Sequence, residues 1–175
     1  MKDDRILITP DNHGDSRHAP KDTTREQFHQ ANLNHIKDVQ NVMARLSIIL
    51  NLQGKQHDWT KLKFEDEFWK DFQDSLLNNG DFVNGTWYQR HVHTEKHHPT
   101  SYCHDDIDLL DIIEMIVDCV CAGKARAGEV RSMEINDEIL KKAFTNTVEL
   151  IDDLTMVDPH PESPYYDWYL DDFDS

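Results

Sequence analysis

The sequence predicts an all-α fold, and three observations support that prediction. Apolar residues recur at helical spacing over long stretches of the 175-residue chain. Little of the sequence alternates with the two-residue period of half-buried strands. Capping residues and helix breakers stand at the ends of the apolar stretches. We therefore expect a helical bundle over residues 22–155, with a flexible N-terminal arm at residues 1–21 and a tail at residues 156–175.

The longest predicted helix begins near Thr23 and runs to Leu52. The stretch TTRE places Glu26 three residues after Thr23, which is the spacing of a capping box. Gly54 is expected to end this helix. In the arm that precedes it, the stretch RILIT at residues 5–9 is compatible with a short strand.

Four later helices complete the predicted bundle. One runs from about His57 through KLKFEDEFWKDFQDSLLN, and the next runs from TWYQRHV to about Lys96, before Pro99. The clearest of them, DDIDLLDIIEMIVDCVCAGKARAG, has a stripe that is expected to face the core: Ile107, Leu110, Ile113, Val117 and Cys121. The last, NDEILKKAFTNTVELIDDL, should be capped by Asn136 or Asp137.

Charge and composition exclude several classes of function. The formal net charge is −16, which argues against nonspecific nucleic-acid binding because that binding needs Lys and Arg to neutralise phosphates. No stretch approaches the ~20 apolar residues of a transmembrane helix, and the stretch MKDDRILITPDNHG has no apolar segment long enough for a signal peptide, so none is expected. Three cysteines without a disulfide pattern are expected to be reduced thiols: Cys103, Cys119 and Cys121. We therefore expect a cytoplasmic protein with no membrane partner.

The tail differs in kind from the helical domain. Its sequence, VDPHPESPYYDWYLDDFDS, mixes prolines, aromatic residues and acids. One interpretation is a disordered, solubilising segment. The other is an adhesive segment that docks on its own domain, on a second subunit or on a basic protein partner.

Histidines and aspartates on three predicted helices indicate a metal site. His35 lies on the apolar face of the first helix, which is expected to be buried. His57 and Asp58 are adjacent, and Asp118 lies within the apolar stretch MIVDCVCA. Burying that carboxylate is costly unless it is paired or binds a metal. Taken singly, each residue has an ordinary structural role, so the metal hypothesis depends on their combination.

Such a mixed nitrogen and oxygen ligand set suits Mn, Fe, Co, Ni or Zn better than Ca. A second group of histidines, His91, His97 and His98, lies between the His-Asp pair and Asp118. If one or two of these imidazoles reach the same cleft, Asp58 could bridge two metal ions. We therefore expect one or two divalent transition-metal ions.

This order of residues, H…HD…(H…H)…D in a helical chain, resembles the HD-domain superfamily of metal-dependent phosphohydrolases. The runs HDWTKL, HVHTEKHHP, DIIEMIVD and FTNT are also similar to an uncharacterised phage and bacterial family related to that superfamily. Thr60 stands where that family usually has Ser, and Cys119 stands where it usually has an aromatic residue. Neither position is a proposed ligand.

The resemblance implies roles for individual residues. His35 matches the first metal ligand of the superfamily, His57 and Asp58 match the signature pair, and Asp118 matches the last ligand. The middle histidines His91, His97 and His98 match only loosely, and at least one is expected to be structural. Lys61 resembles a lysine that faces substrate phosphate, with an ordinary surface lysine as the alternative.

The function that follows is hydrolysis of a phosphate bond in a small nucleotide, either a monoester or a triphosphate. Asp58 and Asp118 would hold the metal, and Glu114 is a candidate general base or a partner of a ligand histidine. Lys61, Arg90 and Lys96 would offset substrate phosphate, and so few cations favour a small nucleotide over a polymer. In a phage, acting in the host cytoplasm, this would adjust nucleotide pools or remove a signalling nucleotide.

Two other functions remain open at this point. HD-like folds with extra histidines also host diiron oxygenases, which need six protein ligands. Alternatively, the chain is an acidic interaction protein that keeps the scaffold and binds a host partner through its surface or tail. A homo-oligomer is compatible with either, because related folds often pair through helices.

Overall fold

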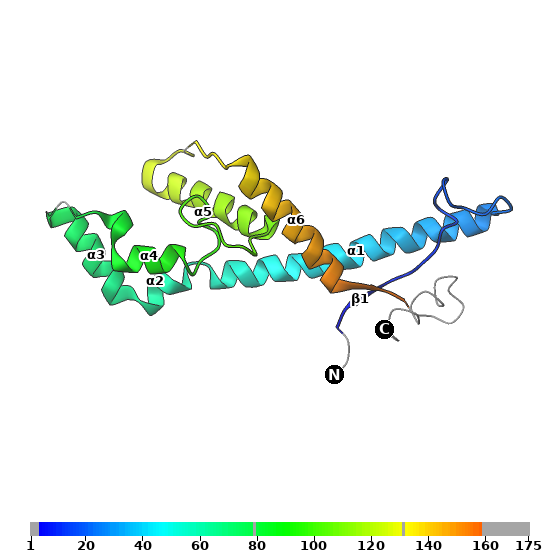
Figure 1. The fold of residues 1–175 in the computed structure, drawn as a ribbon, viewed down its shortest axis with the longest axis horizontal. Coiled ribbons are helices and arrows are strands. Elements are labelled where there is room, and N and C mark those ends of the chain that lie inside the picture. The colour runs from blue at the N-terminus through cyan, green and yellow to red at the C-terminus, as the bar shows by residue number, and fades with distance from the viewer. Residues whose placement is uncertain (1–3, 79, 131, 159–175) are drawn as a thin grey trace. The chain divides into compact units, whose positions relative to one another are not determined.

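The computed structural model describes residues 4–78, 80–130 and 132–158, and most of these residues are helical, which confirms the all-α prediction (Figure 1). The predicted tail lies outside the described residues from position 159 onward. In chain order the elements are β1 (Ile6–Ile8), α1 (Arg25–Gln56), α2 (Trp59–Lys63), α3 (Glu65–Asn78), the 3-10 helix η1 (Phe82–Asn84), α4 (Thr86–Val92), α5 (Leu109–Ala127), α6 (Asp137–Leu154) and β2 (Thr155–Val157). Within the described residues, no helix is both long and apolar enough to cross a membrane.

The chain divides into two compact units. One consists of Met1–Ile48 together with Glu149–Ser175, and the other consists of Ile49–Val148. The predicted boundaries after residues 21 and 155 differ from this division and stay predictions. All but one of the predicted site residues belong to the second unit, and His35 belongs to the first.

In the first unit, the N-terminal segment pairs with the end of the helical region. β1 and β2 form a parallel pair with Ile6 opposite Thr155, which confirms the short strand predicted at RILIT. The Thr9 amide donates to the buried Asp38 carboxylate of α1 at 2.9 Å. A buried carboxylate needs a hydrogen-bond donor, and the Thr9 amide supplies one to Asp38. This hydrogen bond also holds the N-terminal segment against α1.

The predicted first helix forms, but both of its ends shift. Its capping box joins Thr24 and Gln27, with the Gln27 amide 3.2 Å from the Thr24 hydroxyl and the Thr24 amide 2.9 Å from Gln27 Oε1. The expected Thr23 instead bonds the Pro20 carbonyl. Gly54 lies inside α1, because it does not adopt the left-handed conformation that ends a helix at glycine.

The expectation that the apolar stripe of α1 is buried is wrong. Only Ala31 and Asp38 are buried along this helix. Phe28, Ile36 and their apolar neighbours are about half exposed, and His35 is exposed among them. Helical periodicity places these residues on one face, but it does not supply an element that covers that face.

In the second unit, the predicted second helix is broken into α2 and α3. The break falls at Phe64, whose backbone angles, φ −117° and ψ 37°, are not helical. α4 ends at Val92, before the predicted end at Lys96. α3 and α4 lie side by side (Figure 1) and pack through Phe68, which stacks on the buried Trp87 with ring centroids 4.0 Å apart.

α5 and α6 form the apolar core of the second unit, around Ile107, Ile112, Met115 and Ala143. Asn136 caps α6 through the Glu138 amide, as predicted. The core stripe predicted on α5 is partly wrong, because Cys121 is exposed and Ile113 and Val117 are 41% and 55% exposed. The last two line a pocket instead.

Candidate metal centre

The His-Asp pair stands at the sharp turn between α1 and α2. Asp58 has φ 58° and ψ 23°, and it is the one non-glycine residue with positive φ in the described part of the chain. This left-handed conformation is strained for residues other than glycine and is most often tolerated in Asn and Asp. Backbone strain of this kind tends to collect at functional sites. The turn presents both Asp58 oxygens to histidines of the same unit.

Four side chains converge on one point next to this turn. Asp58 Oδ1 lies 3.5 Å from the Nε2 atoms of both His91 and His97. His91 Nε2 lies 2.7 Å from His98 Nε2. Ligand atoms bound tetrahedrally at metal–nitrogen distances of about 2.0–2.1 Å lie roughly 3.3–3.4 Å apart. The two 3.5 Å separations are close to this spacing, whereas the 2.7 Å separation of the His91 and His98 nitrogens is that of a hydrogen bond and must widen when a metal ion binds. The four residues could thus hold one metal ion.

Two atoms of this group are buried without a hydrogen-bond partner, namely Asp58 Oδ1 and His97 Nε2. The His97 side chain is only 1% exposed. Leaving such groups unpaired costs roughly 1–3 kcal/mol each, and more when the group is charged. A metal ion bound to both would satisfy them, so the residues fit the predicted cofactor.

A buried hydrogen-bond chain fixes the tautomer of His91. The Thr60 hydroxyl donates to Glu95 Oε1 at 2.8 Å and lies 2.7 Å from His91 Nδ1. Because the hydroxyl hydrogen is used on the carboxylate, His91 must donate its Nδ1 hydrogen to the Thr60 oxygen. The neutral imidazole then has its lone pair on Nε2, the atom that faces the cluster and accepts a hydrogen bond from His98 Nε2 at 2.7 Å.

Glu114 performs the same role for two other histidines. Its Oε1 lies 2.8 Å from His57 Nδ1 and 3.2 Å from His97 Nδ1. Both histidines therefore donate from Nδ1 and turn Nε2 away from Glu114. A carboxylate behind a histidine in this way orients the ring and raises its strength as a metal ligand. Of the two roles predicted for Glu114, this arrangement favours that of a partner of the ligand histidines over that of a general base.

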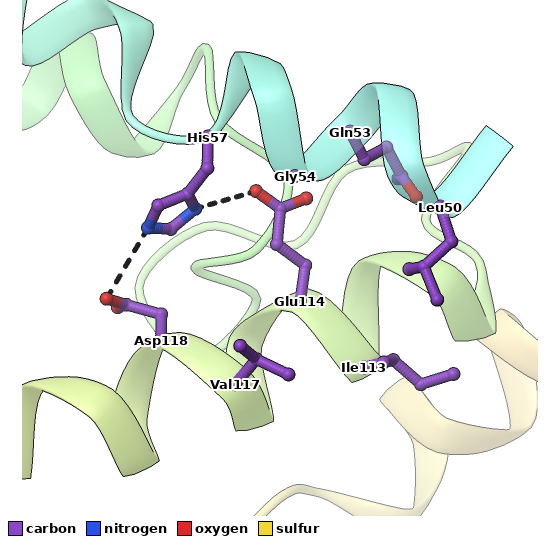
Figure 2. A pocket seen from close by; sticks show the side chains of 8 residues that line it. All are labelled: Leu50, Gln53, Gly54, His57, Ile113, Glu114, Val117 and Asp118. Atoms are coloured by element: carbon purple, nitrogen blue, oxygen red, sulfur yellow. Dashed lines mark hydrogen bonds and ion pairs between the residues drawn. The ribbon is translucent and has the colours of Figure 1, made fainter. Parts of the chain in front are cut away.

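A second group of candidate ligands lies beside the first. His57, His97 and Asp118 each offer one ligand atom within the same small volume. Figure 2 shows His57 between Glu114 and Asp118 of α5, with its Nε2 atom 3.5 Å from Asp118 Oδ1. The same nitrogen lies 3.2 Å from Asp58 Oδ2. The two oxygens of Asp58 thus face different histidines, and Oδ2, which lies near His57, also pairs with Lys61. This arrangement is compatible with the predicted bridging role.

The protonation states of the histidines fit this geometry. Burial, with help from His98, lowers the pKa of His91 to about 3, and burial and His97 lower the pKa of His98 to about 4. Burial also disfavours the imidazolium of His97, but Asp58 and Glu114 outweigh it and raise its pKa to about 9. Without metal, the buried cluster therefore holds one cationic imidazole, whose place a metal ion can take.

The Asp58 carboxylate stays ionised in this setting. Burial raises its pKa, but His97 and Lys61 outweigh that effect and hold the pKa well below its usual range. Lys61 forms an ion pair with Asp58 Oδ2. The carboxylate is therefore charged and available as a ligand at neutral pH.

The other predicted cations lie apart from the cluster. Arg90 pairs with Glu67 at 3.2 Å and stacks over Phe64. Lys96 pairs with Asp106 at 2.6 Å. Neither lines a pocket that the structure describes next to the cluster. Their predicted contact with substrate phosphate gains no support from these positions.

His35 is the one predicted ligand that the structure does not bring into either group of donors. It is exposed and lines a separate pocket of the first unit, together with Gly14 and Asp15 of the N-terminal segment. The structure therefore assembles six of the seven predicted ligands in the second unit: His57, Asp58, His91, His97, His98 and Asp118.

Sequence reasoning missed Thr60 and Glu95, which hold His91, and Arg126, which lines a pocket beside the cluster. The resemblance had marked position 60 only as a replacement of Ser by Thr. Serine and threonine both carry the hydroxyl that the hydrogen-bond chain needs. The retention of a hydroxyl at position 60 was therefore the available signal that this residue has a role in the site.

Comparison with known proteins places this centre in a family. Residues 24–155 match the model of a family described as a family of unknown function (DUF5662). The chain belongs to the DUF5662 family. No curated protein and no solved structure matches it at a significant level. In this DUF5662 chain, the segment that matches the family contains every residue of the two donor groups and their hydrogen-bond partners.

Proposed function

We propose that this DUF5662 protein is a metal-dependent phosphohydrolase that acts on a small nucleotide, as a monoesterase or a triphosphohydrolase. The observation that carries the proposal is the convergence of four donors, of which Asp58 Oδ1 and His97 Nε2 are buried 3.5 Å apart without a hydrogen-bond partner. His91, His97 and His98 would hold one metal ion together with Asp58. The order of these residues in the chain resembles that of HD-domain phosphohydrolases, which supports the choice of reaction.

A bound divalent transition metal would supply a Lewis acid for the phosphoryl oxygen and lower the pKa of a bound water. The protein side chains prepare the site for that chemistry. Glu114 keeps the Nδ1 hydrogens of His57 and His97 away from the cluster. Thr60 and Glu95 do the same for His91. The ligand nitrogens are therefore preorganised, and little reorganisation is needed when a metal and substrate bind.

Lys61 and His57 are the candidates for handling substrate charge and protons. Lys61 is paired with Asp58 and also lines a pocket next to the cluster, so its ammonium group can neutralise part of a substrate phosphate. His57 Nε2 faces both Asp58 and Asp118 at the edge of the cluster. From there it can complete a second metal site or exchange a proton with the leaving group.

The proposal is tested by metal content and phosphate release in wild type and Asp58→Asn. Asn removes the ligand charge but tolerates the left-handed turn at this position. Asp105→Asn is the matched control, because Asp105 is a fully exposed carboxylate paired with Lys142 away from the cluster. Purified protein is loaded with Mn, Fe, Co, Ni or Zn, measured by mass spectrometry, and incubated with a panel of nucleotides.

We expect about one or two metal equivalents in wild type and in Asp105→Asn, with loss of metal and of phosphate release in Asp58→Asn. Metal binding without phosphate release from any nucleotide would overturn the assigned reaction. Absence of metal in the wild type after reconstitution would overturn the metal centre itself.

One observation favours a second candidate, a diiron oxygenase. That chemistry needs six protein ligands, and the two donor groups together contain six different residues. A protein of this type would retain two iron ions and consume oxygen when reduced. Iron content and oxygen consumption, measured on the same preparation as phosphate release, separate the two activities.

A further inference from the structure

Two of the pockets that described residues line adjoin the donor cluster, and they share Asp118. The first, which we call the α4 pocket, has a volume of about 580 Å³ and includes these cluster residues: Lys61, His91, His98 and Asp118. The second, which we call the α5 pocket, has a volume of about 260 Å³ and is drawn in Figure 2. It includes His57, Glu114 and Asp118. Typical small-molecule sites occupy about 300–1,000 Å³, which the first pocket satisfies.

The two pockets differ in charge, although Asp118 lines both of them. In the α4 pocket two cations, Lys61 and Arg126, stand against this one carboxylate. The α5 pocket contains the carboxylates Glu114 and Asp118, with no lysine or arginine in its lining. A phosphate group is attracted by the first pair and repelled by the second. The α4 pocket is therefore the side from which a phosphorylated substrate can approach the cluster.

Arg126 differs from the other arginine and lysine residues near the centre. Arg90 and Lys96 are engaged by acidic residues. In the part of the chain that the structure describes, no acidic side chain pairs with Arg126. Its guanidinium can donate to phosphate in a bidentate manner without first breaking an ion pair.

The rest of the α4 pocket is apolar and largely aromatic. Phe68, Phe82 and Trp87 form a packed wall, with ring centroids 4.0 Å apart for Phe68 and Trp87 and 6.0 Å apart for Phe82 and Trp87. On the open side, Phe72 is 41% exposed and Leu76 is 65% exposed. Such a surface suits a flat aromatic ring, which stacks on aromatic side chains and is removed from water by them.

We propose that the α4 pocket binds the substrate, with its phosphate held by Lys61 and Arg126 and an aromatic base placed against Phe72 and Phe68, behind which the buried Trp87 packs. This inference rests on the proposed function, because it takes the phosphoryl group to react at the cluster. It assigns to this pocket the preference for a nucleotide, which carries a base, over a bare sugar phosphate.

The test uses the metal-loaded full-length protein and two pairs of probes. Binding is measured by calorimetry with the phosphonate analogues of AMP and of ribose 5-phosphate, whose carbon–phosphorus bonds are not hydrolysed. Phosphate release is measured separately with AMP and ribose 5-phosphate. Stacking of one base is worth about 1–3 kcal/mol, so we expect the AMP analogue to bind roughly 5- to 150-fold more tightly than the ribose analogue.

Three variants locate the binding site. Phe72→Ala, at a half-exposed position, should bring the affinity ratio of the two analogues close to one. Arg126→Ala should weaken both analogues by about tenfold or more, because it removes a charge-assisted hydrogen bond. Lys124→Ala removes a charge from the same last turn of α5 outside the pocket, and it should change neither affinity.

A fourth variant tests the rival pocket. Gly54 lines the α5 pocket, and a side chain at this position meets no atom within 4 Å of its Cβ. Gly54→Leu should therefore fill that pocket and leave both affinities unchanged. Weaker binding in Gly54→Leu with normal binding in Phe72→Ala would overturn the assignment in favour of the α5 pocket.

Different experimental results would contradict the assignment of the pocket and the assignment of the reaction. If the AMP analogue binds selectively and Phe72→Ala removes the selectivity, the pocket is supported even when no nucleotide releases phosphate. If phosphate is released from AMP and ribose 5-phosphate with equal kcat/KM and the analogues bind equally, the pocket is overturned and the hydrolase stands. Failure of both analogues to bind also overturns the pocket.

Discussion

At the scale of single residues, the Thr60 hydroxyl decides which nitrogen of His91 carries the hydrogen. Thr60 is 0% exposed and connects His91 to Glu95. Without the hydroxyl, the Nδ1–H of His91 loses its acceptor, and the tautomer that presents Nε2 to the metal is no longer favoured. Thr60 and Glu95 are thus positioning residues that act through a ligand.

This leads to a prediction for metal affinity. Thr60→Val keeps the volume of the side chain but removes the hydroxyl, and it should weaken metal binding by about 10- to 100-fold. Thr60→Ser restores the hydroxyl and should bind as the wild type does. Competition against a chelating dye measures both affinities, with circular dichroism as a check of folding. Equal metal affinity in the Val and Ser variants would contradict the role of the hydroxyl.

Asp111 gives a prediction for stability. It is buried at the start of α5, where it closes a capping box with Asp108 and accepts a hydrogen bond from Gln53. Burial raises its pKa to about 6, compared with about 3.9 in an unfolded chain. The folded state therefore binds this proton more tightly, so the stabilisation is present below about pH 4 and is lost as the pH rises through 6.

Comparison of wild type with Asp111→Asn isolates this contribution, because Asn does not titrate. Between pH 4 and pH 7, the free energy of unfolding of the wild type should fall by up to about 3 kcal/mol relative to the variant. Urea denaturation of the metal-free proteins at pH 4, 5, 6 and 7 gives the two curves. Parallel curves would show that Asp111 has no raised pKa.

At the scale of elements, α5 contributes side chains both to the apolar core and to the donor cluster. Ile112 and Met115 face the core shared with α6, while Glu114 and Asp118 face the metal cluster. The apolar residues Ile113 and Val117 belong to neither set and line the α5 pocket (Figure 2). The core is therefore offset around the helix from the stripe that periodicity predicts.

Alanine substitution of the two glycines at helix ends is expected to have opposite effects on stability. Gly54 lies within α1 in helical conformation, and Gly128 caps α5 with φ 76°. An added Cβ meets nothing within 4 Å at either position. Gly54→Ala should therefore raise the free energy of unfolding by about 0.5–1 kcal/mol, because alanine favours the helix. Gly128→Ala should lower it by about 1–2 kcal/mol, because alanine is strained in the left-handed region.

Thermal and urea unfolding of both variants checks this pair, since the steric surroundings are equally open and only the backbone conformation differs. A loss of stability in Gly54→Ala would mean that Gly54 has a backbone role that its helical conformation does not indicate. An unchanged Gly128→Ala would show that the end of α5 can adopt another conformation at no cost.

At the scale of the whole molecule, metal binding should stabilise the unit formed by residues 49–148. Every donor belongs to this unit, and the donor set exists only when the unit is folded. Free metal at about 100 times its Kd should add roughly 2.7 kcal/mol to the free energy of unfolding. The melting temperature of the wild type should therefore rise with metal and fall with a chelator.

Differential scanning calorimetry measures this shift, with Asp58→Asn as the variant that lacks a ligand. We expect no metal-dependent rise in its melting temperature. An equal rise in wild type and variant would place the stabilising metal at a different site, for example on the exposed acidic surface.

The sequence by itself determined the helical class, the position of most helices and most of the cluster. Helical periodicity and capping residues are local signals, and they located α1, α5 and α6 to within a few residues. The His-Asp pair and the run HVHTEKHHP were visible because this chain of 175 residues has eleven histidines, several of them close together in the sequence. Six of the seven predicted ligands meet in the structure.

Only the tertiary structure decided which of these residues meet and which atoms they use. Periodicity shows which side chains share a face of one helix, but not which faces come together, so it misplaced Ile113 and Val117. The links from Glu114 to His57 and from Thr60 to Glu95 join residues 57 and 35 positions apart. Since hydrogen bonds act at about 3 Å, these partners and the tautomers they impose arise only when the folded chain brings distant segments into contact.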